Sequence, residues 1–155
     1  MFNDPQLEFT TSDFVNIKGG RQSAKYYFSD PEITLKSAPE RNVNFPGSDL
    51  QFNLSSDDLL ALQKASAIYS LPDLTFFSEE GSDTIKLILR DKENDTSNTY
   101  DLTLAGSTTG TFSLDLKIEN IRVLPGDYTV KVSKHLISEW TNTDVDLTYY
   151  IALEP

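Results

Sequence analysis

The sequence contains no cysteine and one histidine, His135. The lack of cysteine excludes disulfides, thiolate nucleophiles and sulfur-ligated metals together. The histidine lies in a predicted hairpin turn, and a serine nucleophile would find no second imidazole base elsewhere in the chain. We therefore expect no catalytic group of residues, no metal and no cofactor, and we predict that the protein is not an enzyme.

Long apolar runs are also missing. No stretch approaches the roughly 18 apolar residues that a membrane-spanning helix needs. The first residues, Met-Phe-Asn-Asp-Pro, have neither the basic nor the apolar region of a signal peptide. We expect a cytoplasmic protein.

Basic residues are few. The chain has 13 Lys and Arg against 24 Asp and Glu, a formal charge of -11. Non-specific affinity for nucleic acid comes largely from bases that neutralise phosphates, so a surface covered with phosphate-binding groups is excluded. A local basic patch remains possible because net charge does not say where charges lie. The 155 residues, 38% of them hydrophobic, suit one globular domain or one domain plus a fragment.

The chain repeats one order of predicted elements. Alternating apolar residues 50–54 precede a helical run over 57–69, a Leu-Pro-Asp turn at 71–73 and a resumed strand. About fifty residues later, strand 112–118 precedes a short turn over 119–123, a Leu-Pro-Gly-Asp turn at 124–127 and another strand. Self-similarity of this kind indicates the unit of architecture. The sequence predicts an α+β protein in which a unit of one helix and several strands is used twice.

The helix over 57–69 has start signals and two distinct faces. Ser55 or Ser56 can cap it, acidic residues occupy its first turn, and Pro72 prevents its continuation. Helical periodicity places Leu59, Leu62, Ala65, Ser66 and Tyr69 on the side that packs on a sheet. The opposite side carries Asp57, Leu60, Lys64, Ala67 and Ile68, so Lys64 is either an ordinary solvated lysine or the only base of a functional face.

The other segments read as strands and connections. Residues 7–28 predict a three-stranded antiparallel meander, which needs a further partner because small sheets are marginal alone. Residues 32–48 have linker composition, yet their apolar members could also lie across a surface or help to bind something. Further strands are expected near 85–90, 100–105, 128–132, 136–140 and 147–153. The polar loop 91–98 does not match a calcium loop, which needs Gly and Glu where Thr96 and Leu102 stand.

This order of strand, helix, Leu-Pro turn and strands resembles the DNA polymerase sliding clamps, or processivity factors, of the T-even-type bacteriophage family. The matching stretches are SDDLLALQKAS at 56–66, YDLTL at 100–104, LPGDY at 124–128 and YYIALE at 149–154. The resemblance covers residues 7–154 and implies the DNA-clamp fold, with two pseudo-symmetric β-α-β-β-β halves and antiparallel sheets. It corresponds to the C-terminal part of a two-domain subunit.

The resemblance implies three segments. Residues 1–31 would be the C-terminal strands of a truncated first clamp domain, residues 32–48 the interdomain connector and residues 49–155 the complete second domain. The chain would then be N-terminally incomplete.

The resemblance also implies a function and its residues. The family forms homotrimeric rings that encircle duplex DNA and tether polymerase, clamp loader and other replication proteins in the infected host, without catalysis. Lys64 and Arg122 would face the DNA, although a second base that the family often carries is Ala67 here. A partner-peptide pocket would take Leu35, Val43, Phe45, Pro46, Leu153, Glu154 and Pro155. The alternative is a β-rich phage structural or adhesion module without DNA binding.

Overall fold

The computed structural model describes residues 2, 4–34 and 43–155. The chain divides into two compact units, residues 1–42 and residues 43–155. Each unit has its own antiparallel sheet.

The first unit is a three-stranded meander of β1 (Gln6–Glu8), β2 (Phe14–Gly19) and β3 (Gln22–Tyr27), followed by one helical turn, α1 (Pro31–Thr34). Gly20 supplies the positive φ of the tight β2–β3 turn. The meander predicted over residues 7–28 is confirmed. Pairing registers place Leu7, Val15, Ile17, Ala24 and Tyr26 on one face, so one side of this sheet is apolar, while the other side mixes polar residues with the ring pair of Phe14 and Tyr27.

The second unit contains the repeated elements. Its first half is β4 (Leu50–Leu54), α2 (Ser56–Tyr69), β5 (Asp73–Ser78), β6 (Thr84–Arg90) and β7 (Tyr100–Thr108). Its second half is β8 (Phe112–Lys117), the 3₁₀ helix η1 (Ile118–Asn120), β9 (Tyr128–Ser133), β10 (Ile137–Asn142) and β11 (Thr148–Ala152). The predicted α+β class and the twice-used order are confirmed, with the helix of the second half reduced to one short turn.

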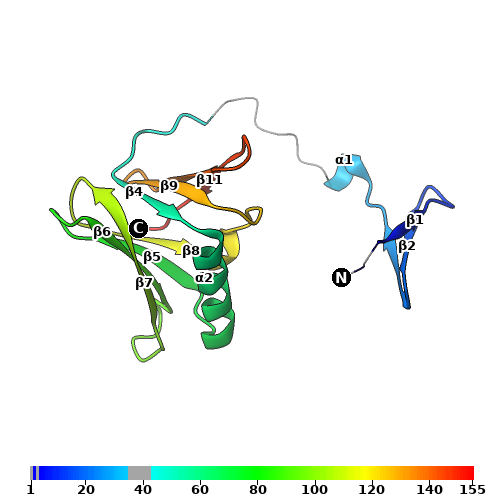
Figure 1. The fold of residues 1–155 in the computed structure, drawn as a ribbon, viewed down its shortest axis with the longest axis horizontal. Coiled ribbons are helices and arrows are strands. Elements are labelled where there is room, and N and C mark those ends of the chain that lie inside the picture. The colour runs from blue at the N-terminus through cyan, green and yellow to red at the C-terminus, as the bar shows by residue number, and fades with distance from the viewer. Residues whose placement is uncertain (1, 3, 35–42) are drawn as a thin grey trace. The chain divides into compact units, whose positions relative to one another are not determined.

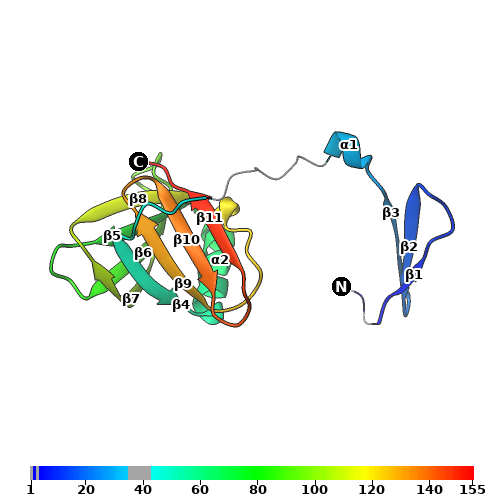
Figure 2. The same cartoon turned by 90° about the horizontal axis from the view of Figure 1, so that it is seen from above.

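Eight strands form one sheet in the order β11-β10-β9-β4-β7-β6-β5-β8. The two halves meet twice in this order, because β4 pairs with β9 and β5 pairs with β8. A bridge between Asp115 on β8 and Glu154 after β11 brings the two ends of the sheet together. Figures 1 and 2 show the sheet curving round, with α2 against it.

Both halves contribute to one core. Alternation buries one side of β4 and of β6, and α2 adds Leu59, Leu62 and Ala65. The largest fully buried side chains are Trp140, Tyr128 and Phe76. Because each half supplies strands to the same core, neither half would bury its apolar face alone.

Local signals explain where α2 begins and ends. Ser55 is the N-cap, and it forms a capping box with Asp58, which decides between the two serines predicted for this role. Ser70 ends the helix in the left-handed conformation. The prediction that Tyr69 packs on the sheet is wrong, since Tyr69 is 49% exposed. The chain turns away directly after it, and Leu71 enters the core instead.

Each Leu-Pro turn closes onto the helix start of the other half. The Asp127 carboxylate accepts a hydrogen bond from the Ser56 backbone N at 2.7 Å. The Pro72 carbonyl accepts one from the Ile118 backbone N at 2.9 Å. The first N–H groups of a helix have no partner within the helix, so these contacts satisfy them while joining the halves.

Replacing the cap residue tests this helix start. Ser55→Ala removes the side chain that accepts from Asp58 N at 3.1 Å, and we expect it to lower the free energy of unfolding by about 1 kcal/mol. Urea denaturation followed by circular dichroism measures the change. Ser113→Ala, at an exposed serine on β8, is the matched control and should stay within about 0.5 kcal/mol. Equal losses in the two variants would argue against the capping role.

Candidate nucleic-acid interface

The outer face of α2 and the segment that follows η1 lie side by side. A surface cavity of about 300 Å³ separates them, and its lining comes from both elements: Ser56, Leu59, Leu60, Gln63, Val123 and Pro125. Figures 1 and 2 place η1 next to α2 in both views. We call this surface, residues 56–68 of α2 with residues 119–125, the helix face.

The helix face carries the two bases singled out in the sequence. Lys64 and Arg122 are exposed, and each is the sequence neighbour of a residue that lines the cavity, Gln63 on α2 and Val123 after η1. The Arg122 Nε atom donates to the Glu119 carbonyl at 3.1 Å, which holds this side chain against η1. Lys64 thus belongs to α2 and Arg122 to the segment after η1, the two elements that border the cavity, and the two bases are 58 residues apart in the sequence.

The charge of the helix face is low. The exposed acids Asp57 and Glu119 offset the two bases. Leu60 is 45% exposed, Ile68 74% and Leu124 56%, so apolar side chains occupy much of the remaining surface. Such a face can contact a phosphate backbone at two points, but it offers little net attraction.

The residues predicted for a partner-peptide pocket have mixed placements. Leu35 lies outside the described residues. Val43, Pro46 and Pro155 are exposed, and Phe45 and Glu154 are half-buried. Leu153 belongs to the core, and its backbone N donates to the Leu136 carbonyl at 2.9 Å. Its side chain is therefore not open to a peptide in this conformation.

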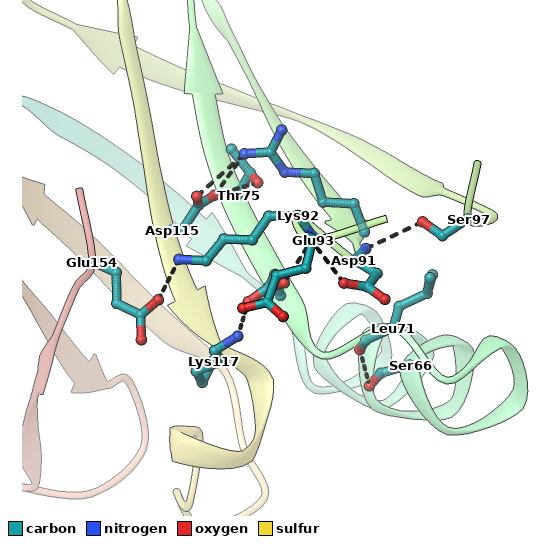
Figure 3. A network of polar contacts seen from close by, with 12 residues as sticks. Ser66, Leu71, Thr75, Asp91, Lys92, Glu93, Ser97, Asp115, Lys117 and Glu154 are labelled. Carbon is teal, nitrogen blue, oxygen red and sulfur yellow. Dashed lines mark hydrogen bonds and ion pairs between the residues drawn. The ribbon is translucent and has the colours of Figure 1, made fainter. Parts of the chain in front are cut away.

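An ionic network that the sequence did not predict lies where the ends of the sheet meet (Figure 3). Asp73 is fully buried and accepts from Lys117 Nζ at 2.6 Å and from Lys92 N at 3.0 Å. Asp115 accepts from the Thr75 hydroxyl at 2.6 Å and pairs with Arg90 at 3.1 Å.

The same network holds the C-terminal segment. The Lys92 ammonium pairs with the Glu154 carboxylate, and the backbones of Asp115 and Glu154 exchange two hydrogen bonds. The network thus contains three ion pairs: Lys117 with Asp73 of β5, Arg90 with Asp115 of β8, and Lys92 with Glu154 after β11. Burial raises the pKa of Asp73, but hydrogen bonds from Lys117 and the Lys92 backbone outweigh it and hold that pKa below its usual 3.8.

No local sequence pattern indicated this network. Asp115 stands at a polar position of the alternating strand 112–118, between Leu114 and Leu116, and β-strand register sets it opposite Thr75. The C-terminal segment bridges to Asp115 through Glu154, and a buried charge is retained only when it is paired. The partner itself could not be named before the pairing of β5 with β8 was known.

The described residues offer little for metal chemistry. Within residues 2, 4–34 and 43–155, no group of three or more His, Asp or Glu residues is placed to hold a metal ion. The 91–98 loop is folded on itself, since the side chains of Asp91 and Asn94 accept from backbone N–H groups within the loop. In the same part of the chain, no helix is long and apolar enough to cross a membrane.

Comparison with known proteins gives consistent results. No family model matches the chain. The sequence is 27% identical, over 158 aligned residues, to the sliding clamp of Vibrio phage KVP40, and the match covers 99% of this chain and 70% of that protein.

Solved structures show a similar fold. The proliferating cellular nuclear antigen of Entamoeba histolytica superposes with a TM-score of 0.58 at 15% identity, covering all of this chain and 66% of that one. The Helicobacter pylori beta clamp bound to a DNA ligase peptide superposes with a TM-score of 0.53 at 17% identity, covering 96% of this chain and 42% of that one. The chain therefore spans less than two thirds of these solved proteins.

Proposed function

We propose that this chain, which belongs to the sliding clamps of phage type, is part of a ring that encircles duplex DNA and holds replication proteins on it without catalysing a reaction. The helix face is the part of the surface that lies against the DNA. Lys64 and Arg122 are its phosphate contacts.

The observation that carries this proposal is the exposure of the helix face. In a β-rich adhesion or structural module built as a sandwich, α2 or the segment after η1 would be buried between layers. Here both elements lie beside one open cavity, and each element carries one exposed base, Lys64 or Arg122. The arrangement suits a surface that follows a duplex.

The low charge of the helix face agrees with a topological role. A protein that holds DNA by phosphate contacts alone needs many bases, and its affinity falls steeply with salt. A closed ring does not dissociate sideways, so weak contacts are enough and sliding stays possible. The remainder of the acidic chain then has no need of basic surface.

We propose that residues 1–31 are the closing strands of another clamp domain, with residues 32–48 as connector. The meander β1–β3 of the first unit resembles the meander β9–β11 of the second unit, which supports this proposal. Tyr26 stands opposite Val15 between β2 and β3, as Tyr149 stands opposite Trp140 between β10 and β11, and a second tyrosine follows each. In the second unit, the Tyr149 hydroxyl accepts from Leu124 N at 3.2 Å, which ties that meander to the turn after η1.

We also propose that partner peptides bind beside the connector. Val43, Phe45, Pro46, Glu154 and Pro155 remain candidate contacts in the described residues, and Leu35 completes the set from sequence. The Helicobacter pylori clamp bound to a DNA ligase peptide is a precedent in the fold for peptide binding. Polymerase and clamp-loader segments are the partners we expect, in a ring that the resemblance makes a homotrimer.

The test removes both bases of the helix face. We expect the Lys64→Ala/Arg122→Ala double variant to be retained several-fold less on nicked circular duplex DNA at about 50 mM salt, because two phosphate contacts are lost. Its free energy of unfolding should stay within about 0.5 kcal/mol of the parent, since both side chains are exposed.

Lys86→Ala/Lys134→Ala is the matched control, because it removes two exposed bases that lie outside the helix face. Its retention should equal that of the parent protein. Unchanged retention of the helix-face variant, or an equal loss in the control, would contradict the assignment of Lys64 and Arg122.

A further inference from the structure

We propose that Asp57 and Glu119 are repelling charges of the helix face, which keep its contact with the DNA backbone weak enough for the protein to slide. The inference rests on the proposed function and deepens it, because it names the residues that limit the affinity of the same surface for duplex DNA. A surface built only to bind phosphates would carry bases or neutral donors at these positions.

Each element of the helix face carries one exposed acid and one exposed base. On α2, Asp57 and Lys64 are seven residues apart, which is about two turns, so helical periodicity puts them on the same side. In the segment 119–125, Glu119 and Arg122 are three residues apart, and Arg122 Nε donates to the Glu119 carbonyl at 3.1 Å. The two acids therefore lie beside the two proposed phosphate contacts.

The four charges of the helix face take part in no ion pair within residues 2, 4–34 and 43–155. Elsewhere on the surface, bases do pair with acids, as Lys131 does with Glu139 at 2.8 Å. The carboxylates of Asp57 and Glu119 are thus left open to solvent, on the side where we place the DNA.

Other acids already serve the start of α2. Asp58 forms the capping box with Ser55, and the Asp127 carboxylate accepts from the Ser56 backbone N at 2.7 Å. These two acids place negative charge at the positive end of the helix dipole. Asp57 joins neither contact, so its charge is free to act on whatever lies against the helix face.

Simple electrostatics gives the size of the effect. A duplex carries one phosphate charge per about 1.7 Å of its axis, so a backbone that touches Lys64 also passes within about 10 Å of Asp57. Two unit charges about 10 Å apart in water change an equilibrium constant about twofold. The two acids together therefore weaken the contact about fourfold at low salt, and less at 0.1 M salt, where screening sets in beyond about 10 Å.

Neutralising the two acids tests their role. We expect Asp57→Asn/Glu119→Gln to bind a short DNA duplex about fourfold more tightly than the parent at about 10 mM salt, and less than twofold more tightly at about 100 mM. A titration followed by nuclear magnetic resonance measures such weak binding and also locates it, because the amide signals of residues 56–68 and 119–125 should shift.

Glu93→Gln/Asp95→Asn is the matched control, because it removes the same amount of negative charge at exposed acids outside the helix face. Its affinity for the duplex should equal that of the parent, and circular dichroism should show all variants folded. An equal gain in the control would overturn the inference, since total charge would then explain the effect. No gain in the helix-face variant would overturn it as well.

The proposed function fails by a different result. If the parent does not bind the duplex, or if Lys64→Ala/Arg122→Ala binds it as the parent does, the proposed function is overturned and this inference with it. If the parent binds through Lys64 and Arg122 while Asp57→Asn/Glu119→Gln binds no more tightly, only the role of the two acids is overturned.

Discussion

Asp73→Ala is expected to lower the free energy of unfolding by about 3 kcal/mol, because it removes the acid at the centre of the ionic network. The carboxylate is fully buried, and it is bonded to Lys117 Nζ at 2.6 Å and to Lys92 N at 3.0 Å. Without it, a half-buried ammonium and a backbone N–H lose their acceptor together. Lys117 can still turn towards water, which keeps the loss at the lower end of the range for buried pairs.

Chemical denaturation followed by circular dichroism measures this loss. Glu93→Ala is the matched control, since Glu93 is an exposed acid next to Lys92, and its replacement should change the free energy of unfolding by less than about 0.5 kcal/mol. Equal effects of the two variants would show that Asp73 contributes no more than a surface charge.

The ion pair between Asp73 and Lys117 also predicts that stability depends on pH. The pKa of Asp73 lies below 3.8 in the folded protein, so the pair stabilises fully above about pH 3.8 and loses that contribution as the pH falls below it. The difference in free energy of unfolding between the parent and Asp73→Ala should therefore be constant near neutral pH and shrink below pH 3.8. A difference that persists unchanged in acid would contradict the charged state of Asp73.

Short-range patterns made much of the fold predictable. The helix α2 was found within one residue of its observed ends because capping, apolar periodicity and a following proline are all local. The strand pairs around 85–90 and 100–105 were visible because their alternation places every second residue in the core. The repeated order of these local elements then indicated a two-half domain.

Contacts between distant residues were not predictable in the same way. The position of Asp73 in a strand looked like turn chemistry after Leu-Pro, whereas its burial depends on β8, about forty residues later. The closure of the sheet through Asp115 and Glu154 depends likewise on where the chain's end lies. Tyr69 was misplaced because helical periodicity does not indicate how far the sheet extends beneath the helix.

The candidate site was only partly readable. Periodicity placed Lys64 on the outer side of α2, but nothing local linked it to Arg122, and the resemblance to clamps supplied that link. The structure adds the cavity between α2 and the segment after η1, and the low charge of the surface around it. Apolar residues such as Ile68 at the surface were visible in the sequence, but their exposure follows from the way that α2 packs.

Trp140→Ala is expected to be the most destabilising single change, at about 3–5 kcal/mol. The indole is fully buried, its ring lies 6.2 Å from that of Tyr128 in an edge-on arrangement, and its Nε1 donates to the Ser138 hydroxyl at 2.9 Å. Truncation to alanine leaves a cavity in the core against β10, the strand between β9 and β11, because Trp140 is the largest buried side chain of the second half.

A graded variant separates packing from hydrogen bonding. Trp140→Phe keeps an aromatic ring against Tyr128 but removes the N–H donor, and it should cost about 1–2 kcal/mol. Because Trp140 is the only tryptophan in the chain, denaturation must be followed by circular dichroism rather than by indole fluorescence. If Trp140→Ala lowered the free energy of unfolding no more than Trp140→Phe does, the stabilisation at this position would come from the hydrogen bond to Ser138. The packing of the indole ring in the core would then contribute little.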